Sequence, residues 1–470
     1  MDALDICYLS ALELRERYRR RELSPLEVTG LILERIGTLN PSLNAFLTVT
    51  VERALDDARA AERAYGSEGE PGPLAGIPIS IKDLTPTAGI RTTMGSLLFQ
   101  DWVPNEDGPF VERVNAAGAI MLGKTNTPEF GWKGDSGNRL IGPTHNPWKH
   151  GATAGGSSGG AAAAVAAGLG PLAQGSDGAG SIRIPAGFSG IFGLKPTLGL
   201  VAYYPASAVE VLSHLGPMTR TVRDAGLLLN VVGRQDDRDR YSYPTETDYV
   251  AACDGGIAGL RVAWSPDLGY APVDPEVREI TTRAAQRLSD LGAHVEEVDP
   301  GIPDPWDTLD TIWIAAQAGR HKDDFDSVRE LIDPGRIELV ERGRQLTAVD
   351  LYDAHVQRTA LYHQWRRFFE NGKWDLLVTP QLPVTAFPAG DNHPGTINGQ
   401  PVNYLGWTAF TYPFNLTGQP AATVPCGFAA NGLPVCLQFV GRWRDDATVL
   451  RAAAAYEEMA PWAQHRPPLD

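Results

Sequence analysis

A run of very small side chains sets the strongest limit on how this chain of 470 residues can fold. Residues 155–167 read GGSSGGAAAAVAA, and the alanines between Gly160 and Ala167 favour a helix. Neighbouring backbone can approach such a helix very closely, which suits a buried position better than a surface one. We therefore expect a buried helix that supports a functional site.

Helix and strand patterns alternate along the rest of the chain. Ser24 as an N-cap, Pro25 at the first helical position and Glu27 predict a helix over residues 25–38. A strand over Ile77–Ile81 would leave Lys82 at the end of a buried strand. The other expected elements are helices over 51–65, 110–117 and 275–291, strands over 119–122, 260–264, 295–298 and 376–379, and a loop over 123–160. This alternation predicts an α/β fold with a largely buried sheet.

Charge and cysteine content exclude several classes of protein. The 41 Lys and Arg against 57 Asp and Glu give a net charge of −16, which repels phosphate backbones and anionic lipids. Cys7, Cys253, Cys426 and Cys436 show neither metal-ligand spacing nor a disulfide pattern. No apolar leader or membrane-length apolar run occurs. We expect a cytoplasmic protein that binds neither nucleic acid nor membranes.

Two short patterns match known formulas by letter only. Gly118–Thr125 fits the P-loop formula, but residues 119–122 favour a strand where a phosphate-binding loop must turn, and Pro128 disfavours the helix that should follow. Residues 155–160 fit GxSxG, yet a nucleophile elbow must leave a hydrophobic strand, and the preceding residues read as loop. A classical Ser-His-Asp α/β-hydrolase stays an alternative, although none of the nine histidines lies in a context that marks it as a base.

Lys82 is a candidate general base. A buried ammonium group is desolvated and tends to lose its proton, so a lysine at the end of a buried strand can accept a proton near neutral pH. The alternative is an ion pair between Lys82 and Asp83 or another carboxylate.

A second candidate element is the segment Gly175–Arg183. Small residues directly before Ser181 allow a tight turn whose backbone N–H groups converge, as an oxyanion hole for acyl transfer requires. Ser181 could then attack a carbonyl group held by those amides. Asp177 and Arg183 flank the turn, and the apolar residues around them favour an ion pair across its base.

Residues 155–199 resemble the signature of the amidase signature family, serine hydrolases that cut carbon–nitrogen bonds with a Ser-cis-Ser-Lys triad. The resemblance covers nearly the whole chain. Further similar stretches are residues 74–84, 122–132, 142–148, 212–225 and 413–427. The resemblance implies an α/β fold with a large mixed β-sheet core sandwiched by helices. It also implies a single domain over 1–470, with the core signature at about 74–225 and a more variable cap-like region at about 300–372.

The resemblance also assigns roles to residues. Ser181 matches the nucleophile, Ser157 the bridging serine in a cis peptide, and Lys82 the base, with no metal or organic cofactor. The implied oxyanion hole consists of the backbone N–H groups of Gly178, Ala179, Gly180 and Ser181. Asp177, Arg183 and Ser158 would support these groups. Two positions depart from the usual pattern, because Ala179 replaces a common Gly and Ser189 a common Cys.

A bridging hydroxyl has a physical reason. A neutral lysine amine that cannot reach the nucleophile directly can take its proton through an O–H group, which both donates and accepts. The expected reaction is hydrolysis of linear amides through a serine acyl-enzyme.

The substrate is constrained less well. Candidate pocket aromatics favour small to medium apolar or aryl amides, and Trp132 is the one we name for the pocket; the others are Tyr203, Tyr204, Trp313 and Trp407. Esters and carbamates (urethanes) are further candidates, because their carbonyl groups are attacked in the same way. The alternative within the family is a glutaminase-like subunit of a transamidating amidotransferase complex. A non-catalytic binding protein on the same fold would not need Lys82, Ser157 and Ser181. A homodimer is left open.

Overall fold

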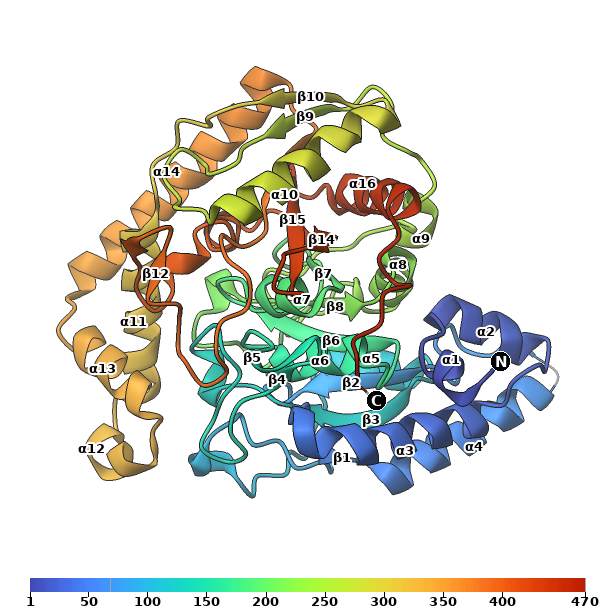
Figure 1. The fold of residues 1–470 in the computed structure, drawn as a ribbon. Helices are drawn as coiled ribbons and strands as arrows, with labels where there is room; N and C mark the ends of the chain where they lie inside the picture. Colours follow the sequence, from blue (N-terminus) through green and yellow to red (C-terminus); the bar gives the residue numbers. More distant parts are fainter. Residues whose placement is uncertain (68, 470) are drawn as a thin grey trace.

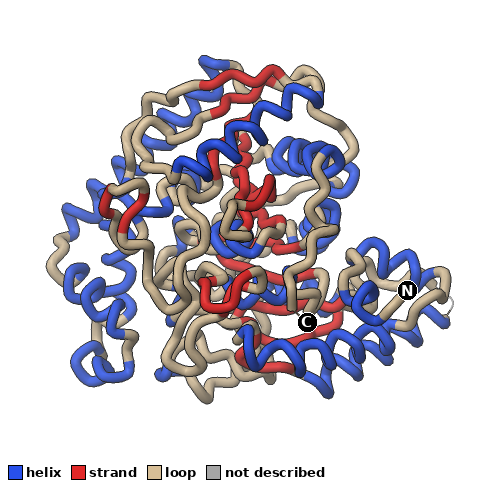
Figure 2. The backbone as a smooth tube through the Cα atoms, viewed as in Figure 1, coloured by secondary structure: helices blue, strands red, loops and turns tan. Residues whose placement is uncertain are grey.

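A mixed sheet of eleven strands runs through the centre of the molecule (Figures 1 and 2). The computed structural model describes residues 1–67 and 69–469. The strands pair in the order β1 (Phe46–Val49), β3 (Ile120–Thr125), β2 (Pro78–Lys82), β6 (Leu172–Asp177), β8 (His214–Thr219), β7 (Phe192–Lys195), β14 (Ala421–Phe428), β15 (Pro434–Gly441), β11 (Leu376–Pro380), β9 (Arg261–Trp264) and β10 (His294–Glu297). Strand β2 is parallel to both β3 and β6, and β9 is parallel to β10 and β11, whereas the other pairs are antiparallel. The expected α/β fold with a large mixed sheet is confirmed.

Helices cover both faces of this sheet (Figure 1). They are α1 (Ala3–Cys7), α2 (Ala11–Arg19), α3 (Pro25–Leu43), α4 (Val51–Gly66), α5 (Pro109–Ala116), α6 (Gly159–Ala166), α7 (Arg183–Ser189), α8 (Val222–Val232), α9 (Tyr249–Ala252), α10 (Pro275–Gln286), α11 (Trp306–Arg320), α12 (Phe325–Val328), α13 (Pro334–Gly343), α14 (Ala348–Gly372), α15 (Pro413–Thr417) and α16 (Asp446–Met459). Helices α11 to α14 form one flank of the molecule, away from the N-terminal helices α1 to α4 (Figure 1). Two short hairpins, β4 (His145–Asn146) with β5 (Lys149–Thr153) and β12 (Thr396–Ile397) with β13 (Gln400–Pro401), lie outside the main sheet.

Most expected elements are present with shifted ends. The helix predicted over 25–38 continues to Leu43, because Leu39 and Leu43 extend its buried stripe and Asn44 ends it in a left-handed conformation. The helix predicted over 275–291 ends at Gln286 and continues as a 3-10 turn.

The loop predicted over 123–160 is wrong in part, because β3 runs on to Thr125 and β4 and β5 form a hairpin there. Gly123 interrupts the apolar run of this strand, so the pattern predicts a strand end that is too early. It has φ +142°, and an added Cβ would lie 2.1 Å from the Thr48 carbonyl oxygen of the neighbouring strand.

The small side chains of α6 are buried, as the sequence predicts. At Gly160 an added Cβ would lie 2.3 Å from the backbone nitrogen of Asn126, so only glycine lets these two backbone segments meet. The helix begins directly after Ser157 and Ser158 and packs against β6 and α7. Its packing therefore fixes the two serines against the elements that carry Ser181.

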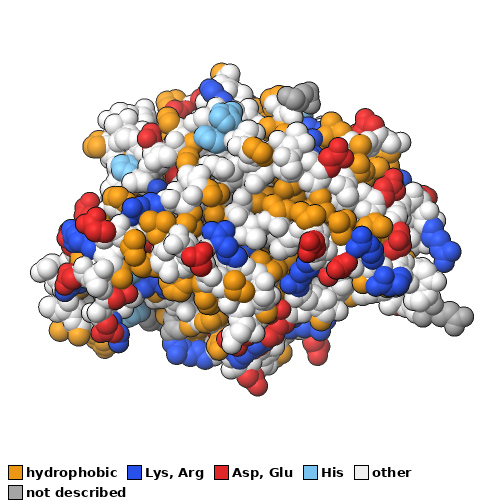
Figure 3. Space-filling model, turned by 90° about the horizontal axis from the view of Figure 1, so that it is seen from below, with side chains coloured by type: hydrophobic (Ala, Val, Ile, Leu, Met, Phe, Trp, Pro, Cys, Tyr) orange, Lys and Arg blue, Asp and Glu red, His pale blue; other side chains and the backbone are white. Residues whose placement is uncertain are grey.

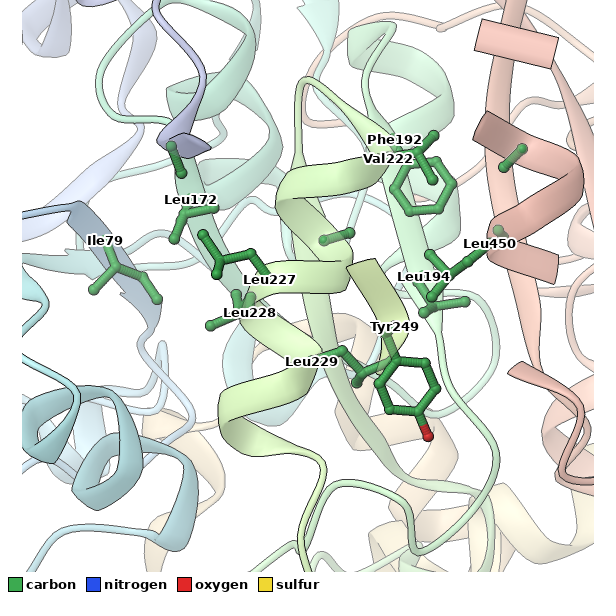
Figure 4. Packing of buried hydrophobic residues seen from close by; sticks show 14 of the residues in the cluster. Ile79, Leu172, Phe192, Leu194, Val222, Leu227, Leu228, Leu229, Tyr249 and Leu450 are labelled. Carbon is green, nitrogen blue, oxygen red and sulfur yellow. The ribbon is translucent and has the colours of Figure 1, made fainter. Parts of the chain in front are cut away.

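The largest hydrophobic core surrounds α8, whose leucines pack among side chains of β2, β6, β7 and α16 (Figure 4). Labelled examples are Ile79, Leu172, Phe192, Leu194, Leu227, Leu228, Leu229 and Leu450. Burial of apolar surface contributes roughly 25 cal/mol per Å² to the free energy of folding, so this core holds the strand ends in place.

The surface carries acidic and basic side chains that are interspersed on the face shown in Figure 3. Within residues 1–67 and 69–469, no helix combines the length and the apolar character that a membrane crossing needs. All four cysteines are free thiols.

Candidate active site

Lys82 and the turn before Ser181 meet because their strands are parallel neighbours. Strand β2 ends at Lys82 and β6 ends at Asp177, and the two strands pair in parallel register. The carboxyl ends of parallel strands lie at the same edge of a sheet. The N-terminal end of α6 brings Ser157 and Ser158 to the same edge.

The Lys82 amine is surrounded by hydroxyl groups. Its Nζ lies 2.6 Å from Ser157 Oγ, 2.8 Å from Ser158 Oγ and 3.0 Å from Ser176 Oγ. The side chain is fully buried, and no carboxylate lies within ion-pair distance of it in the part of the chain that the structure describes. Burial holds the pKa of Lys82 well below its ordinary value, and the more distant charge of Asp177 opposes this shift only in part.

Asp83 does not pair with Lys82, which was the alternative role for this lysine. The Asp83 carboxylate lies 3.8 Å from Lys124 Nζ and accepts hydrogen bonds from the backbone and hydroxyl groups of Thr93. Burial lowers the pKa of Lys124 to about 8, against the opposing charge of Asp83. The lysine that carries an ion pair at this sheet edge is therefore Lys124.

Ser157 and Ser181 lie in adjacent loops. The peptide bond between Gly156 and Ser157 is cis. The backbone N–H of Ser158 donates to the carbonyl oxygen of Ser181 at 3.1 Å, which ties the two loops together. Ser157 is 1% and Ser181 7% exposed. Of the two serine side chains, only that of Ser157 is hydrogen-bonded to Lys82 among the described residues.

The turn that carries Ser181 is organised by Asp177. One carboxylate oxygen accepts the N–H of Gly180 at 2.7 Å and the other accepts the N–H of Ile182 at 3.2 Å, on either side of Ser181. Arg183 closes the base of the turn with bonds of 3.0 and 3.1 Å to the same carboxylate, and both side chains are fully buried. Burial acts to raise the pKa of Asp177, but the charge and hydrogen bonds of Arg183 outweigh it and hold that pKa well below its usual range.

The expected oxyanion hole is only partly available. Because the Gly180 N–H donates to Asp177, it is not free to hold a substrate oxygen, and this corrects the expectation for Gly180. The N–H groups of Gly178, Ala179 and Ser181 have no acceptor among the described residues. Gly180 has φ +130°, and an added Cβ there would lie 2.4 Å from Thr411 Oγ1, so this position needs glycine. Ala179 does not have a positive φ, so alanine replaces glycine there without backbone strain.

Four further residues of the site were not named from the sequence, although all except Thr411 lie in stretches that resemble the family. Ser176 Oγ contacts Lys82, and Gln174 accepts the backbone N–H of Lys82 at 3.0 Å. Asn415 donates to Asp177 at 2.8 Å, and Thr411 donates to the carbonyl oxygen of Ala179 at 2.7 Å. The similarity of residues 413–427 to the family was the only available signal for Asn415.

A cavity of about 180 Å³ borders the site, with walls that include Leu84, Met94, Val209 and Trp313. Its inner end is located by two glycines. A Cβ added at Gly131 would lie 3.0 Å from both Leu84 Cδ1 and Ser157 Oγ, and one added at Gly178 would lie 3.1 Å from the Trp313 ring. Two wall residues of the cavity, Leu84 and Trp313, therefore lie next to Ser157 and to the oxyanion turn.

The aromatic residues named from the sequence divide between this cavity and other places. Tyr203 and Trp313 line it. Trp132 lies instead in a separate cavity of about 470 Å³ with Trp306 and Tyr404, because its indole packs against Gly335 of α13. Trp132 therefore does not line the cavity next to Ser157, and its role in substrate binding stays a prediction. Outside the cavity, Trp407 stacks on Phe188 and Arg238 stacks on Tyr204.

His214 is the histidine next to the turn, since it pairs with Asp177 across the sheet. Its Nδ1 lies 2.8 Å from the carbonyl oxygen of Leu212, and its Nε2 has no hydrogen-bond partner among the described residues. Burial and the charge of Lys195 lower its pKa well below the ordinary value. His214 therefore does not contact Ser181 as a triad base would.

The arrangement supplies a buried amine, two hydroxyl groups and free backbone N–H groups at one end of a cavity. The described residues contain no cluster of three or more His, Cys, Asp or Glu side chains able to hold a metal ion. Such a set can activate a serine and hold an oxyanion.

Comparison with known proteins finds amidases among those that are similar to this chain. A family model described as Amidase matches residues 27–450. The chain is 41% identical over 473 residues to an acylamidase of Rhodococcus erythropolis, covering 99% of this chain and 98% of the relative. It is 37% identical over 494 residues to a glutamyl-tRNA(Gln) amidotransferase subunit of Moorella thermoacetica, covering 99% of each. A solved bacterial aryl acylamidase of the amidase signature enzymes has a TM-score of 0.91 and 31% identity, over 97% of each chain.

Proposed function

Because this chain belongs to the amidase signature family, we propose that its hydrolysis of amides proceeds through an acyl-enzyme on Ser181. The observation that carries the proposal is the burial of Lys82 Nζ 2.6 Å from Ser157 Oγ, beside the turn that presents Ser181. Lysine is normally an acid at neutral pH, and only a desolvated one offers a lone pair.

The proton of Ser181 moves in two steps. Ser157 Oγ accepts the proton of Ser181 as Ser181 Oγ bonds to the substrate carbonyl carbon, and the proton of Ser157 passes to the neutral amine of Lys82. Ser158 and Ser176 hold the lysine amine in place through their hydroxyl groups. The same relay then returns a proton to the departing nitrogen, which leaves as a neutral amine.

The N–H groups of Gly178, Ala179 and Ser181 hold the negative charge that develops on the carbonyl oxygen. Donors fixed in advance, as Asp177 fixes this turn, stabilise that charge without reorganising during the reaction. Water then attacks the acyl-enzyme by the same route in reverse, releases the acid and restores Ser181.

We propose small to medium apolar or aryl amides as substrates. The cavity walls formed by Leu84, Met94, Val209 and Trp313 support this, as does similarity to an acylamidase and to an aryl acylamidase. Esters and carbamates would enter the same path. All the residues of the site come from one chain, so the mechanism is the same for a monomer and for a homodimer. The free cysteines fit a reducing compartment such as the cytoplasm.

The test combines a substrate panel with a matched pair of serine variants. The purified chain is assayed on aryl amides, an ester, a carbamate and glutamine, and is then labelled with a fluorophosphonate probe. We expect Ser181→Ala to abolish turnover and labelling. Ser189→Ala is the control, because the buried Ser189 hydroxyl has no hydrogen-bond partner among the described residues and should be dispensable. Stoichiometric labelling of Ser181→Ala would refute the assignment. Preference for glutamine, with activity only alongside partner proteins, would favour the amidotransferase alternative.

A further inference from the structure

The cavity beside the serines adjoins a larger one. The second cavity is about 750 Å³, and it shares a wall with the first that includes Phe130, Val209, Ala316 and Arg320. A substrate whose amide lies at the serines would therefore extend past this shared wall toward the outside.

Arg320, the last residue of α11, is the positively charged side chain in the shared wall. Its guanidinium carbon lies 3.5 Å from the centre of the Phe130 ring and 5.7 Å from that of Phe99. Across residues 1–67 and 69–469, the guanidinium group has neither a hydrogen-bond acceptor nor a carboxylate within 4.0 Å. Its contacts within the protein are thus aromatic rings, and because Arg320 is an exposed residue its five N–H donors are open to solvent or to a ligand.

The neighbouring Arg336 differs from Arg320 because its guanidinium group has hydrogen-bond partners within the protein. It also stacks on Phe130, at 4.6 Å, but it donates to Glu129 at 2.8 Å and to Gln317 at 3.0 Å. Its remaining nitrogen lies 3.2 Å from His321 Nε2. Arg336 is fully buried and paired, whereas Arg320 faces the cavities.

The acids nearest to Arg320 are already engaged. Glu129 accepts hydrogen bonds from Arg336, from the backbone of Asp333 and from Ser96. Asp324 lies 3.0 Å from His321 Nδ1. Arg320 is exposed at the surface, yet desolvation by the cavity walls and the charge of Arg336 lower its pKa to about 10, with Glu129 and Asp324 opposing, so the group stays charged at neutral pH.

We propose that Arg320 binds a carboxylate that the amide substrate carries at the end remote from the scissile bond. The inference rests on the proposed function and names the substrate class of the same site. A planar guanidinium fork matches a carboxylate with two parallel hydrogen bonds. The apolar side chains of the shared wall, Phe130, Val209 and Ala316, suit a methylene or aryl spacer, so the proposed substrates are amides with an apolar middle and an anionic end.

Two pairs of substrates test this, one for each orientation in the cavity. Glutaryl-4-nitroanilide is compared with pentanoyl-4-nitroanilide, and N-acetyl-4-aminobenzoate with 4-methylacetanilide. In each pair a carboxylate replaces a methyl group. The measured quantity is the ratio of kcat/KM for the anionic over the neutral member, in which any loss common to both cancels.

We expect Arg320→Gln to lower this ratio about 10- to 100-fold in one of the two pairs, the effect of losing a charged hydrogen-bond partner. Arg320→Lys should give an intermediate ratio, because it keeps the charge and loses the fork. Arg344→Gln is the matched control. Arg344 also stacks on a phenylalanine, Phe325, but lines neither cavity.

An unchanged ratio in Arg320→Gln for both pairs would overturn the inference and leave Arg320 as a stacking residue only. An equal fall in Arg344→Gln would overturn it as well, because the effect would then be a general one of charge. These results are separate from failure of the proposed function, which shows as turnover of the neutral anilide by Ser181→Ala.

Discussion

Replacing Arg183 with alanine tests whether the base of the Ser181 turn controls catalysis. Arg183 donates to Asp177 with two nitrogens, to the carbonyl oxygen of Thr411 at 2.9 Å, to Gln438 at 2.8 Å and to Asn415 at 2.6 Å. The Arg183→Ala variant removes all of these bonds at once. It leaves the Asp177 carboxylate fully buried with the two backbone N–H groups and Asn415 as its remaining partners.

The expected loss of stability is large. Removing one partner of a buried ion pair costs about 3–5 kcal/mol, and the partners that Asp177 keeps place this variant near the lower value. An unfolding entropy of about 2.1 cal/mol/K per residue gives about 1 kcal/mol/K for 470 residues, so Tm should fall by about 3 °C. Activity should fall further, because Asp177 then lacks the two Arg183 bonds that fix its carboxylate under Gly180 and Ile182, and a 1 Å displacement of a reacting group can cost about 100-fold in rate.

The assay measures Tm by calorimetry, kcat/KM on an anilide, and the rate of fluorophosphonate labelling. Arg220→Ala is the control, because Arg220 is also buried and donates to three backbone carbonyls, of Leu9, Val165 and Gly170. We expect both variants to lose stability and only Arg183→Ala to lose labelling rate. Equal labelling rates in Arg183→Ala and the unmodified enzyme would refute the reasoning, whatever the change in Tm.

Three further predictions concern the proton relay and a mechanism without a metal. Ser157→Ala should lower kcat by a factor of about 10² to 10⁴, the usual value of acid–base assistance, and near-normal turnover would remove Ser157 from the relay. Because burial lowers the pKa of Lys82, kcat/KM should rise about tenfold per pH unit below that pKa and level off well before pH 10.5. Lys82→Ala should eliminate this rise of kcat/KM with pH, and His214→Asn should preserve it. The reverse result would assign the base to histidine. EDTA should not change kcat, and inhibition that added zinc reverses would contradict a metal-free mechanism.

The elements nearest to the chemistry could be predicted because their local sequence decides their conformation. The strand before Lys82, the Ala-rich helix after Ser158 and the glycines around Ser181 are short-range patterns, and the structure has each of them. The length of β3 could not be read in this way. Gly123 interrupts its apolar run, and only the close approach of Thr48 from the neighbouring strand explains a glycine there.

The residues that hydrogen-bond to Arg183 at the base of the turn could not be predicted for a different reason. Thr411, Asn415 and Gln438 are between 228 and 255 residues from Arg183 in the chain, and only the tertiary fold brings them together. Sequence spacing carries no information on such distant contacts. Gly180 shows the same limit on a smaller scale, since its position in the turn suggests a free N–H and the Asp177 side chain takes it.

The residues proposed for the reaction and those that line the cavities come from different parts of the fold. Lys82, Ser157 and Ser181 lie at the ends of elements of the central sheet and of α6, and the chemistry proposed for them needs only an amide carbonyl. Trp313 and Arg320 come from α11, on the flank, and reach the site through packing against residues of the core signature. Changes in α11 would therefore alter which amides fit without disturbing the relay. This explains why the motifs identify the bond that is cut, whereas the group carried by the substrate has to be inferred from Arg320.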